Sequence, residues 1–421
     1  MDKFIIYGGN RLKGQVRISG SKNAALPILC SSILADSPCT YTNVPRLMDI
    51  STICAVLGKL GIKVKRPEQN TIVLDPTAID SFEAPYDLVK SMRASIQVLG
   101  PLLAKYGKAK VSLPGGCAIG VRPIDLHLKA LTKMGADIDL SHGYVMASAD
   151  RLSGAHIVFE KTTVGGTENI MCAACLAEGT TIIEGAAMEP EVVDLAGALN
   201  AMGACIEGAG TSTMVIEGVK SLSGLDYAVI PDRIELGTLM VAAAITKGRL
   251  TIKGGRADHV TAIINKLTEM GVAIEARQDG DILVNGEGDL KPVQVETVPY
   301  PGFPTDMQAQ IMSLACVAHG VSSITENIFE NRFMHVPELM RMGGNLDEKG
   351  TTVIVRGIER FQGATVMATD LRASASLVLA ALNASGYTEI RRIYHLDRGY
   401  EGLDKKLVAL GAEVTREKGG L

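Results

Sequence analysis

Two kinds of helix alternate along the chain, and the placement of their apolar residues tells them apart. The first kind is apolar on nearly all faces, as in segments 23–35, 171–179, 239–248 and 376–386. Helices of this kind belong inside a domain. The second kind is amphipathic and ends in glycine; Leu267 and Met270, for example, precede Gly271, which suits the left-handed end of a helix. Runs rich in β-branched residues follow the helices, so the pattern predicts alternating helices and strands.

This pattern recurs six times. The glycines that end the second helix are about 70 residues apart, and they are Gly61, Gly135, Gly203, Gly271, Gly343 and Gly411. Each interval indicates a β-α-β-α-β-β unit, with three units before about Gly224 and three after it. A solenoid that only binds partners is the alternative, but solenoid repeats are usually shorter than about 50 residues. We therefore predict two closed α/β domains with apolar helices inside, sheets outside and a ligand-binding cleft between them.

The ends of the repeats carry two further expectations. Segment 227–234 is expected to open the fourth unit. Residues 1–21 form a predicted strand pair without a unit of their own, so we expect them to complete the last unit.

Composition narrows the class of protein. The chain has 421 residues, which is too long for a single ordinary hydrophobic core, so we expect two domains. Because 47% of the residues are apolar and 21% are charged, we expect the chain to be folded. The net charge is −4 without a basic run, which argues against nucleic-acid binding. The N-terminus lacks a signal-peptide pattern, and the most apolar stretch, 239–245, is far shorter than a membrane span.

The eight cysteines are irregularly spaced, which favours reduced thiols in a cytoplasm. Cys172 and Cys175 match a CxxC pattern within an apolar helical stretch, so we expect buried core cysteines rather than a metal or redox site. Cys117 differs, because it lies in the glycine-rich run 114–120 with Arg122 five residues later. An exposed thiol near a cation is reactive; a small apolar side chain in a surface loop is the alternative.

Charged residues near predicted helix starts indicate an anion site. Helix N-termini favour anions, and a nearby cation strengthens the preference; such cations are Lys22, Arg93, Arg332, Arg372 and Arg398. Taken by itself, Asp306 is typical of a helix N-cap, but in a cationic cleft it would serve as a general base. The run 161–166 offers Lys161 and backbone N–H groups that suit a diphosphate.

At these residues the chain resembles the enolpyruvyl transferases. The matching motifs run in order from residue 20 to residue 401 and are GSKNAALP, SMRAS, PGGCAIGVRPIDLH, KTTVGGT, EPEVVDL, PDRIE, FPTDMQAQ, FENRFMHVPEL, ATDLRASASL and YHLDRGYE. The resemblance implies two inside-out α/β domains of pseudo-threefold symmetry, 22–230 with the Cys117 loop and 1–21 plus 231–421, with the active site in the cleft between them.

The resemblance also implies a reaction. Phosphoenolpyruvate would react with the 3-hydroxyl of UDP-N-acetylglucosamine through a tetrahedral ketal, releasing phosphate in the first committed step of peptidoglycan synthesis. No cofactor or metal, nucleic acid or membrane insertion is implied, and the enzyme would be a cytoplasmic monomer or weak oligomer. The related shikimate-pathway synthase lacks the thiol loop and stays an alternative, as does a catalytically silent or binding-only relative.

Residue roles carry over by matching position. Lys22, Arg122 and Arg398 would hold phosphate, Arg332 and Arg372 the carboxylate, and Asn23 would contact both substrates. Asp306 would take the hydroxyl proton. Cys117 would donate a proton, or hold phosphoenolpyruvate covalently and gate product release; fosfomycin would modify it. The nucleotide sugar would contact Asn23, Arg93, Arg122, Pro123, Ile124, Asp125, Leu126, Lys161, Thr162, Thr163, Val164, Asp306 and Ile328.

Overall fold

The computed structural model describes residues 2–89, 92–113, 124–278 and 280–418. These residues divide into two compact units. The N-terminal unit contains residues 20–113 and 124–230, and the C-terminal unit contains residues 2–19 and 231–418. Within the described residues, the chain passes between the units after Ser19 and after Ile230.

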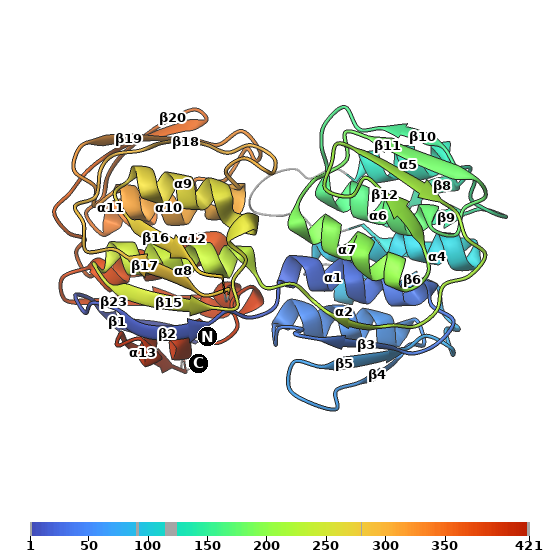
Figure 1. Cartoon of the computed structure of the whole chain (residues 1–421), viewed down its shortest axis with the longest axis horizontal. Helices are drawn as coiled ribbons and strands as arrows, with labels where there is room; N and C mark the ends of the chain where they lie inside the picture. Colours follow the sequence, from blue (N-terminus) through green and yellow to red (C-terminus); the bar gives the residue numbers. More distant parts are fainter. Residues whose placement is uncertain (1, 90–91, 114–123, 279, 419–421) are drawn as a thin grey trace. The chain divides into compact units, whose positions relative to one another are not determined.

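Each unit carries three four-stranded sheets of one topology (Figure 1). In every sheet two parallel strands are followed by two antiparallel ones, which is the order expected of a repeat. The N-terminal sheets are β14(Asp226–Ala228)-β3(Cys39–Thr42)-β5(Ile72–Asp75)-β4(Lys63–Lys65), β6(Glu83–Ala84)-β7(Lys108–Ser112)-β9(Tyr144–Ser148)-β8(Asp137–Ser141) and β10(His156–Val158)-β11(Thr180–Glu184)-β13(Thr213–Glu217)-β12(Cys205–Glu207).

The C-terminal sheets repeat this order. They are β2(Lys13–Arg17)-β15(Arg249–Lys253)-β17(Ile282–Asn285)-β16(Ala273–Ala276), β18(Gln294–Glu296)-β19(Val321–Thr325)-β21(Thr352–Arg356)-β20(Asn345–Lys349) and β22(Thr365–Met367)-β23(Tyr387–Arg391)-β1(Lys3–Tyr7)-β24(Glu413–Glu417).

Each unit also contains several helices, and these differ in how far they are buried. In the N-terminal unit they are α1(Lys22–Ser31), η1(Ser32–Leu34), α2(Met48–Lys59), α3(Tyr86–Val89), η2(Arg93–Val98), α4(Leu99–Tyr106), α5(Asp125–Lys133), α6(Val164–Ala174) and α7(Pro190–Ala201). In the C-terminal unit they are α8(Arg233–Ile245), η3(Ala257–Val260), α9(Thr261–Glu269), η4(Thr305–Met307), α10(Gln308–Ala315), α11(Val336–Arg341), α12(Leu371–Asn383), η5(Ile393–Arg398) and α13(Leu403–Ala409).

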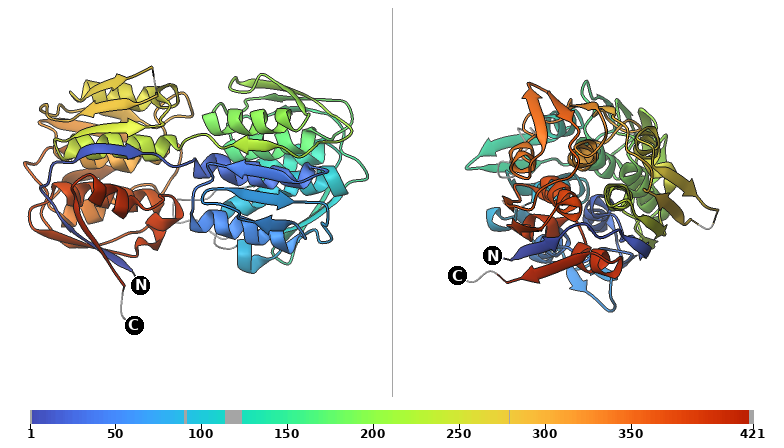
Figure 2. Two further views of the ribbon diagram at one scale, coloured as in Figure 1. Left: turned by 60° about the horizontal axis from the view of Figure 1, so that its bottom comes forward. Right: turned by 90° about the vertical axis from the view of Figure 1, so that its left-hand side faces the viewer.

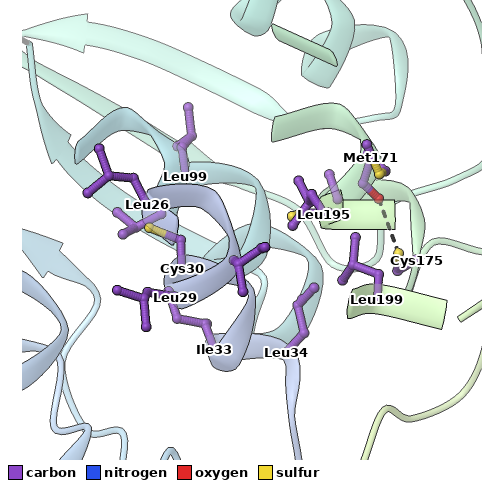
Figure 3. Packing of buried hydrophobic residues seen from close by; sticks show 14 of the residues in the cluster. Leu26, Leu29, Cys30, Ile33, Leu34, Leu99, Met171, Cys175, Leu195 and Leu199 are labelled. Carbon is purple, nitrogen blue, oxygen red and sulfur yellow. Dashed lines mark hydrogen bonds between the residues drawn. The ribbon is translucent and has the colours of Figure 1, made fainter. Parts of the chain in front are cut away.

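The first helix of each repeat is the core helix, as the all-round apolar pattern predicts. Every residue of α8 is buried, and α8, α10 and α12 pack against one another. In the N-terminal unit, α1, α4, α6 and α7 bring their Leu, Ile, Met and Cys side chains together (Figure 3). The predicted α/β fold class with buried helices and outer sheets is confirmed.

The six glycines behave as the repeat predicts. Gly61, Gly135, Gly203, Gly271, Gly343 and Gly411 all have positive φ, between 89° and 105°. Residues with a Cβ atom are strained in this region, so glycine ends the second helix at low cost and turns the chain into the next strand.

Two expectations about the ends of the repeats are wrong in part. Only β1 of the first strand pair joins the last repeat, where it lies between β23 and β24; the two chain ends are accordingly adjacent (Figure 2). β2 instead pairs with β15 in the fourth repeat. Segment 226–228, expected near the start of the fourth unit, pairs as β14 with β3 of the first repeat. In each unit, strands from one end of its chain thus complete sheets whose other strands lie elsewhere in the sequence.

The two cysteines of the CxxC pattern are buried, as predicted. Cys172 and Cys175 are 3% and 0% exposed, and the Cys175 thiol donates to the Met171 carbonyl at 3.2 Å. Cys205 in β12 is exposed. No helix among the described residues is long and apolar enough to cross a membrane.

Candidate active site

The centre of the candidate site in the C-terminal unit is the carboxylate of Asp306. Its Oδ1 accepts from Arg332 Nη2 and its Oδ2 accepts from Arg372 Nη2, both at 2.8 Å. The two arginine side chains are 4% and 5% exposed, whereas that of Asp306 is 27% exposed. Charge-assisted bonds of this kind are about twice as strong as neutral ones. A partly accessible carboxylate thus holds two buried guanidinium groups around one point.

Arg372 keeps bonding capacity beyond this pair. Its Nε and Nη1 atoms are buried and have no hydrogen-bond partner within the described part of the chain. Burial alone would lower the pKa of Arg372, but Asp306 and the neighbouring Tyr400 and Asp232 raise it overall. The guanidinium is therefore charged, with N–H groups left for an anion. A carboxylate or phosphate suits the planar fork of arginine.

Local structure explains how these groups are aimed. Asp306 lies within η4, which begins after Pro304, so the interpretation of Asp306 as an N-cap is wrong. Asp370 is the residue that caps α12: its Oδ1 accepts from the N–H groups of Arg372 at 2.8 Å and Ala373 at 3.1 Å. This cap fixes the first turn of α12 and with it the start of the Arg372 side chain.

Glu326 organises the same region, and the sequence analysis missed it. This side chain is 3% exposed. Its Oε1 accepts from the N–H groups of Ile328 at 2.8 Å and Phe329 at 3.1 Å, and its Oε2 accepts from the Thr305 hydroxyl at 2.9 Å. One buried carboxylate thus ties the predicted sugar contact Ile328 to the residue before Asp306. Only its place between a strand and the FENRFMH motif could have drawn attention to it.

Arg398 is the remaining cation predicted in this unit. It ends η5, and the next helix, α13, begins five residues later at Leu403. Its charge acts near the start of α12: burial lowers the pKa of His395, Arg398 lowers it further, and Asp370, the N-cap of α12, opposes the shift. Arg398 therefore lies in the neighbourhood of Asp370, the cap that precedes Arg372. Arg332 also does not begin a helix, because α11 starts four residues later at Val336.

Lys22 begins α1 in the N-terminal unit, as predicted. Ser21 caps this helix by accepting from Ala24 N at 3.3 Å, so the Lys22 and Asn23 N–H groups lie in its first turn. The Lys22 ammonium is 3.4 Å from Asp49 Oδ2, and the two side chains are 12% and 5% exposed. A largely buried ammonium at a helix N-terminus is a suitable phosphate ligand.

The predicted nucleotide-sugar contacts of this unit lie on two helix starts. Thr163 caps α6 and accepts from Gly166 N at 3.2 Å, while Lys161 and Thr162 precede it as exposed residues. α5 begins after Ile124, and the two helices pack against each other. They are joined by the contact of His127 Nδ1 with Asn169 Nδ2 at 3.1 Å.

This contact brings the segment with Ile124, Asp125 and Leu126 beside the segment with Lys161 and Val164. Asp125 also pairs with Lys129 at 3.3 Å. The first N–H groups of α6 have no acceptor within the helix, which suits a diphosphate.

Several predicted residues lie outside the described part of the chain. They are Cys117, Arg122 and Pro123. Arg93 begins η2, as predicted, but its side chain also lies outside what the structure describes.

Comparisons with known proteins agree with the resemblance of the motifs. The chain matches the EPSP synthase (3-phosphoshikimate 1-carboxyvinyltransferase) family over residues 6–407. It is 57% identical over 416 residues to a UDP-N-acetylglucosamine 1-carboxyvinyltransferase of Geotalea uraniireducens (strain Rf4), covering 99% of both chains. It is also 57% identical over 417 residues to the protein of that name from Nitratidesulfovibrio vulgaris (strain DP4), covering 99% of this chain and 100% of the relative.

Solved structures give the same picture. The enolpyruvyl transferase NikO from Streptomyces tendae is 28% identical, with a TM-score of 0.89 over 100% of this chain and 99% of that one. An EPSP synthase from Acinetobacter baumannii has a TM-score of 0.78 at 19% identity, covering 99% of this chain and 100% of that one, and shows the shared fold. The resemblance inferred from the motifs is confirmed.

Proposed function

Since this chain belongs to the EPSP synthase (3-phosphoshikimate 1-carboxyvinyltransferase) family, we propose that it transfers the enolpyruvyl group of phosphoenolpyruvate to the 3-hydroxyl of UDP-N-acetylglucosamine. The observation that carries the chemistry is the Asp306 carboxylate between the buried guanidinium groups of Arg332 and Arg372. The choice of acceptor rests on 57% identity, over 99% of the chain, to relatives named for UDP-N-acetylglucosamine.

The reaction is an addition followed by an elimination. In the addition, the sugar hydroxyl loses its proton and its oxygen bonds to the phosphate-bearing carbon, while the methylene carbon gains a proton and becomes a methyl group. The resulting tetrahedral ketal then loses a methyl proton and phosphate, which restores the double bond. Such chemistry needs a base for the hydroxyl, an acid for the methylene carbon and fixed positive charge around two anionic groups.

The described residues of the C-terminal unit fit the base and part of the positive charge. Asp306 takes the hydroxyl proton or orients the hydroxyl. Arg332 and Arg372 hold the carboxylate of phosphoenolpyruvate, and the buried N–H groups of Arg372 that find no acceptor among the described residues support this role. The phosphate is assigned to Arg398, Lys22 and Arg122.

The proton for the methylene carbon is assigned to Cys117. The alternative role for this thiol is covalent holding of phosphoenolpyruvate and gating of product release, and both roles make it the residue that fosfomycin modifies. The glycines of the 114–120 run and nearby Arg122 support a reactive thiol.

The nucleotide sugar is assigned to residues of both units. In the N-terminal unit, the helix starts of α5 and α6 support binding of the uridine and diphosphate parts through Ile124 to Leu126 and Lys161 to Val164. In the C-terminal unit, Asp306 and Ile328 reach the sugar, and their shared support by Glu326 favours a common ligand. Asn23, Arg93, Arg122 and Pro123 complete the proposed set.

The competing function is enolpyruvyl transfer to a different acceptor, shikimate 3-phosphate. The family description names the shikimate 3-phosphate enzyme, whereas the 57% identical relatives are named for UDP-N-acetylglucosamine. The proposed reaction places the chain in peptidoglycan synthesis and in the cytoplasm, where free cysteines persist; seven of the eight cysteines are described and all seven are free. A monomeric or weakly oligomeric state stays a prediction.

Phosphate release tests the proposed function directly. Purified protein is incubated with phosphoenolpyruvate alone, with added UDP-N-acetylglucosamine, or with added shikimate 3-phosphate, each with and without EDTA. We expect phosphate only with UDP-N-acetylglucosamine, at equal rates with and without the chelator. Release with shikimate 3-phosphate alone would assign the competing function, and loss of activity in EDTA would contradict the metal-free reaction.

A further inference from the structure

A buried polar cluster contacts the Asp306 site, and its residues come from three separate segments of the C-terminal unit. Tyr400 follows η5, Thr238 lies on α8 and Gln310 on α10. They are 3%, 2% and 0% exposed. The Tyr400 hydroxyl is 2.9 Å from Thr238 Oγ1 and 3.2 Å from Gln310 Nε2. The sequence pattern gave these three residues no role, because each lies within an apolar helix or a motif whose other residues were assigned.

The number of available protons decides which group donates in each hydrogen bond of this cluster. Thr238 Oγ1 donates its only proton to the Ile234 carbonyl at 2.8 Å, so the Tyr400 hydroxyl is the donor toward Thr238. Tyr400 then accepts from Gln310 Nε2. The same Gln310 amide donates to the backbone carbonyl of Asp306 at 2.9 Å. Burial raises the pKa of Tyr400, which keeps the phenol protonated for this role.

The other side of Tyr400 meets the anion site. The guanidinium carbon of Arg372 lies 5.6 Å from the centroid of the Tyr400 ring, within the range of a cation–π contact. Arg372 donates to Asp306 in turn. One tyrosine therefore touches Arg372 with its ring and reaches the Asp306 backbone through Gln310 with its hydroxyl.

We propose that Tyr400, acting with Gln310 and Thr238, is a positioning residue that holds Asp306 and Arg372 at a fixed distance and angle for catalysis. The inference rests on the function proposed above, in which Asp306 acts on the sugar hydroxyl and Arg372 on the phosphoenolpyruvate carboxylate. Reaction partners must be placed to within about an ångström, because such a displacement can lower the rate on the order of 10²-fold.

The cost of burying this cluster favours a functional origin. α8, α10 and α12 are the equivalent core helices of three repeats, and apolar side chains fill most of their length. Polar groups in such a place stabilise a protein only when they are hydrogen-bonded, and Gln310 Oε1 is buried without a partner within the described part of the chain, so an apolar core would be at least as stable. What they add is a directional link between two functional residues that come from different repeats.

The test separates positioning from packing by comparing two threonines. Thr238→Val removes the hydroxyl at nearly constant shape, and Thr238→Ser retains it. Thr246→Val is the matched control, because Thr246 follows the end of the same helix, is buried and donates to the carbonyl four residues earlier at 2.7 Å. Tyr400→Phe removes the phenol but keeps the ring beside Arg372. For each protein, kcat, both KM values and Tm are measured.

We expect Thr238→Val and Tyr400→Phe to lower kcat/KM for phosphoenolpyruvate on the order of 10-fold or more, with wild-type values in Thr238→Ser and Thr246→Val. Equal kinetics in Thr238→Val and Thr246→Val at matched Tm would overturn the inference, as would a wild-type KM and kcat in Tyr400→Phe. Wild-type protein without turnover would instead overturn the proposed function, so the two failures are distinct.

Discussion

Replacing Asp306 by Asn should uncouple anion binding from turnover. In the native chain each carboxylate oxygen of Asp306 accepts from one buried guanidinium, at 2.8 Å in both cases. Asparagine has one oxygen and one NH₂ group, so one arginine would face a donor instead of an acceptor. The two guanidinium groups would also lose the negative charge that separates them. The variant should therefore be less stable without ligand and should bind anions more readily.

The size of the effect follows from burial. Two unit charges about 4 Å apart attract by about 4 kcal/mol at an effective dielectric constant of about 20, and desolvation cancels part of this. Breaking a fully buried pair costs about 3–5 kcal/mol. Because the Asp306 side chain is 27% exposed, we expect a smaller loss of about 2–4 kcal/mol, or roughly 5–15 °C in Tm for a unit of this size.

Thermal unfolding with and without inorganic phosphate measures this effect. A ligand at about 100 times its Kd stabilises the folded protein by about 2.7 kcal/mol, so phosphate should recover much of the loss and raise the Tm of Asp306→Asn more than that of wild type. Asp258→Asn is the control, because Asp258 bonds to Arg256 in the same unit but is 61% exposed, and such pairs contribute about 0–1 kcal/mol.

Turnover of Asp306→Asn should fall on the order of 10²-fold or more, since the general base is lost. A Tm equal to that of Asp258→Asn, with no added response to phosphate, would show that Asp306 does not hold the two arginines apart. Near-normal turnover would remove its role as the base.

Two further predictions concern single titrating or reactive groups. Fosfomycin should alkylate Cys117 alone, and mapping of the modified peptides by mass spectrometry tests this. The exposed Cys205 is the internal control for simple accessibility, and an adduct on Cys205 but not on Cys117 would refute the assignment. Burial lowers the pKa of His335 from 6.5 to about 4. Between about pH 4 and pH 6.5, His335 therefore takes up a proton when the protein unfolds. The free energy of unfolding should therefore fall as the pH drops from about 6.5 to about 4, by up to about 3 kcal/mol from this group. His335→Gln should flatten that part of the denaturant-derived stability profile, and an unchanged slope would contradict the burial argument.

The repeat itself is readable in the sequence because its signals are local. A glycine that needs positive φ, an amphipathic turn before it and an all-apolar helix beside it each depend on a few neighbouring residues. Gly271 and its five equivalents therefore predict the turns correctly, with φ between 89° and 105° throughout. The same local signals predict that the first helix of each repeat, such as α8, is buried.

Strand exchange between repeats was beyond the sequence. β1 has the same alternation whichever sheet it joins, and only the closure of a ring of three sheets places it between β23 and β24. For the same reason β14 completes the first repeat rather than opening the fourth. The identity of an edge partner depends on which edge is left open in space.

The candidate site divides in the same way. The resemblance of the motifs identified Asp306, Arg332 and Arg372 as a set, but their residue types give no distances. Asp306 lies 26 residues from Arg332 in the same repeat and 66 residues from Arg372 in the next repeat, and the two bonds exist only because the fold brings these three segments together. The residue types of Glu326 and Tyr400 do not indicate their partners. Glu326 bonds to other segments of its own repeat, and Tyr400 bonds to two other repeats. These bonds exist only once the chain has folded, so tertiary structure alone decided them.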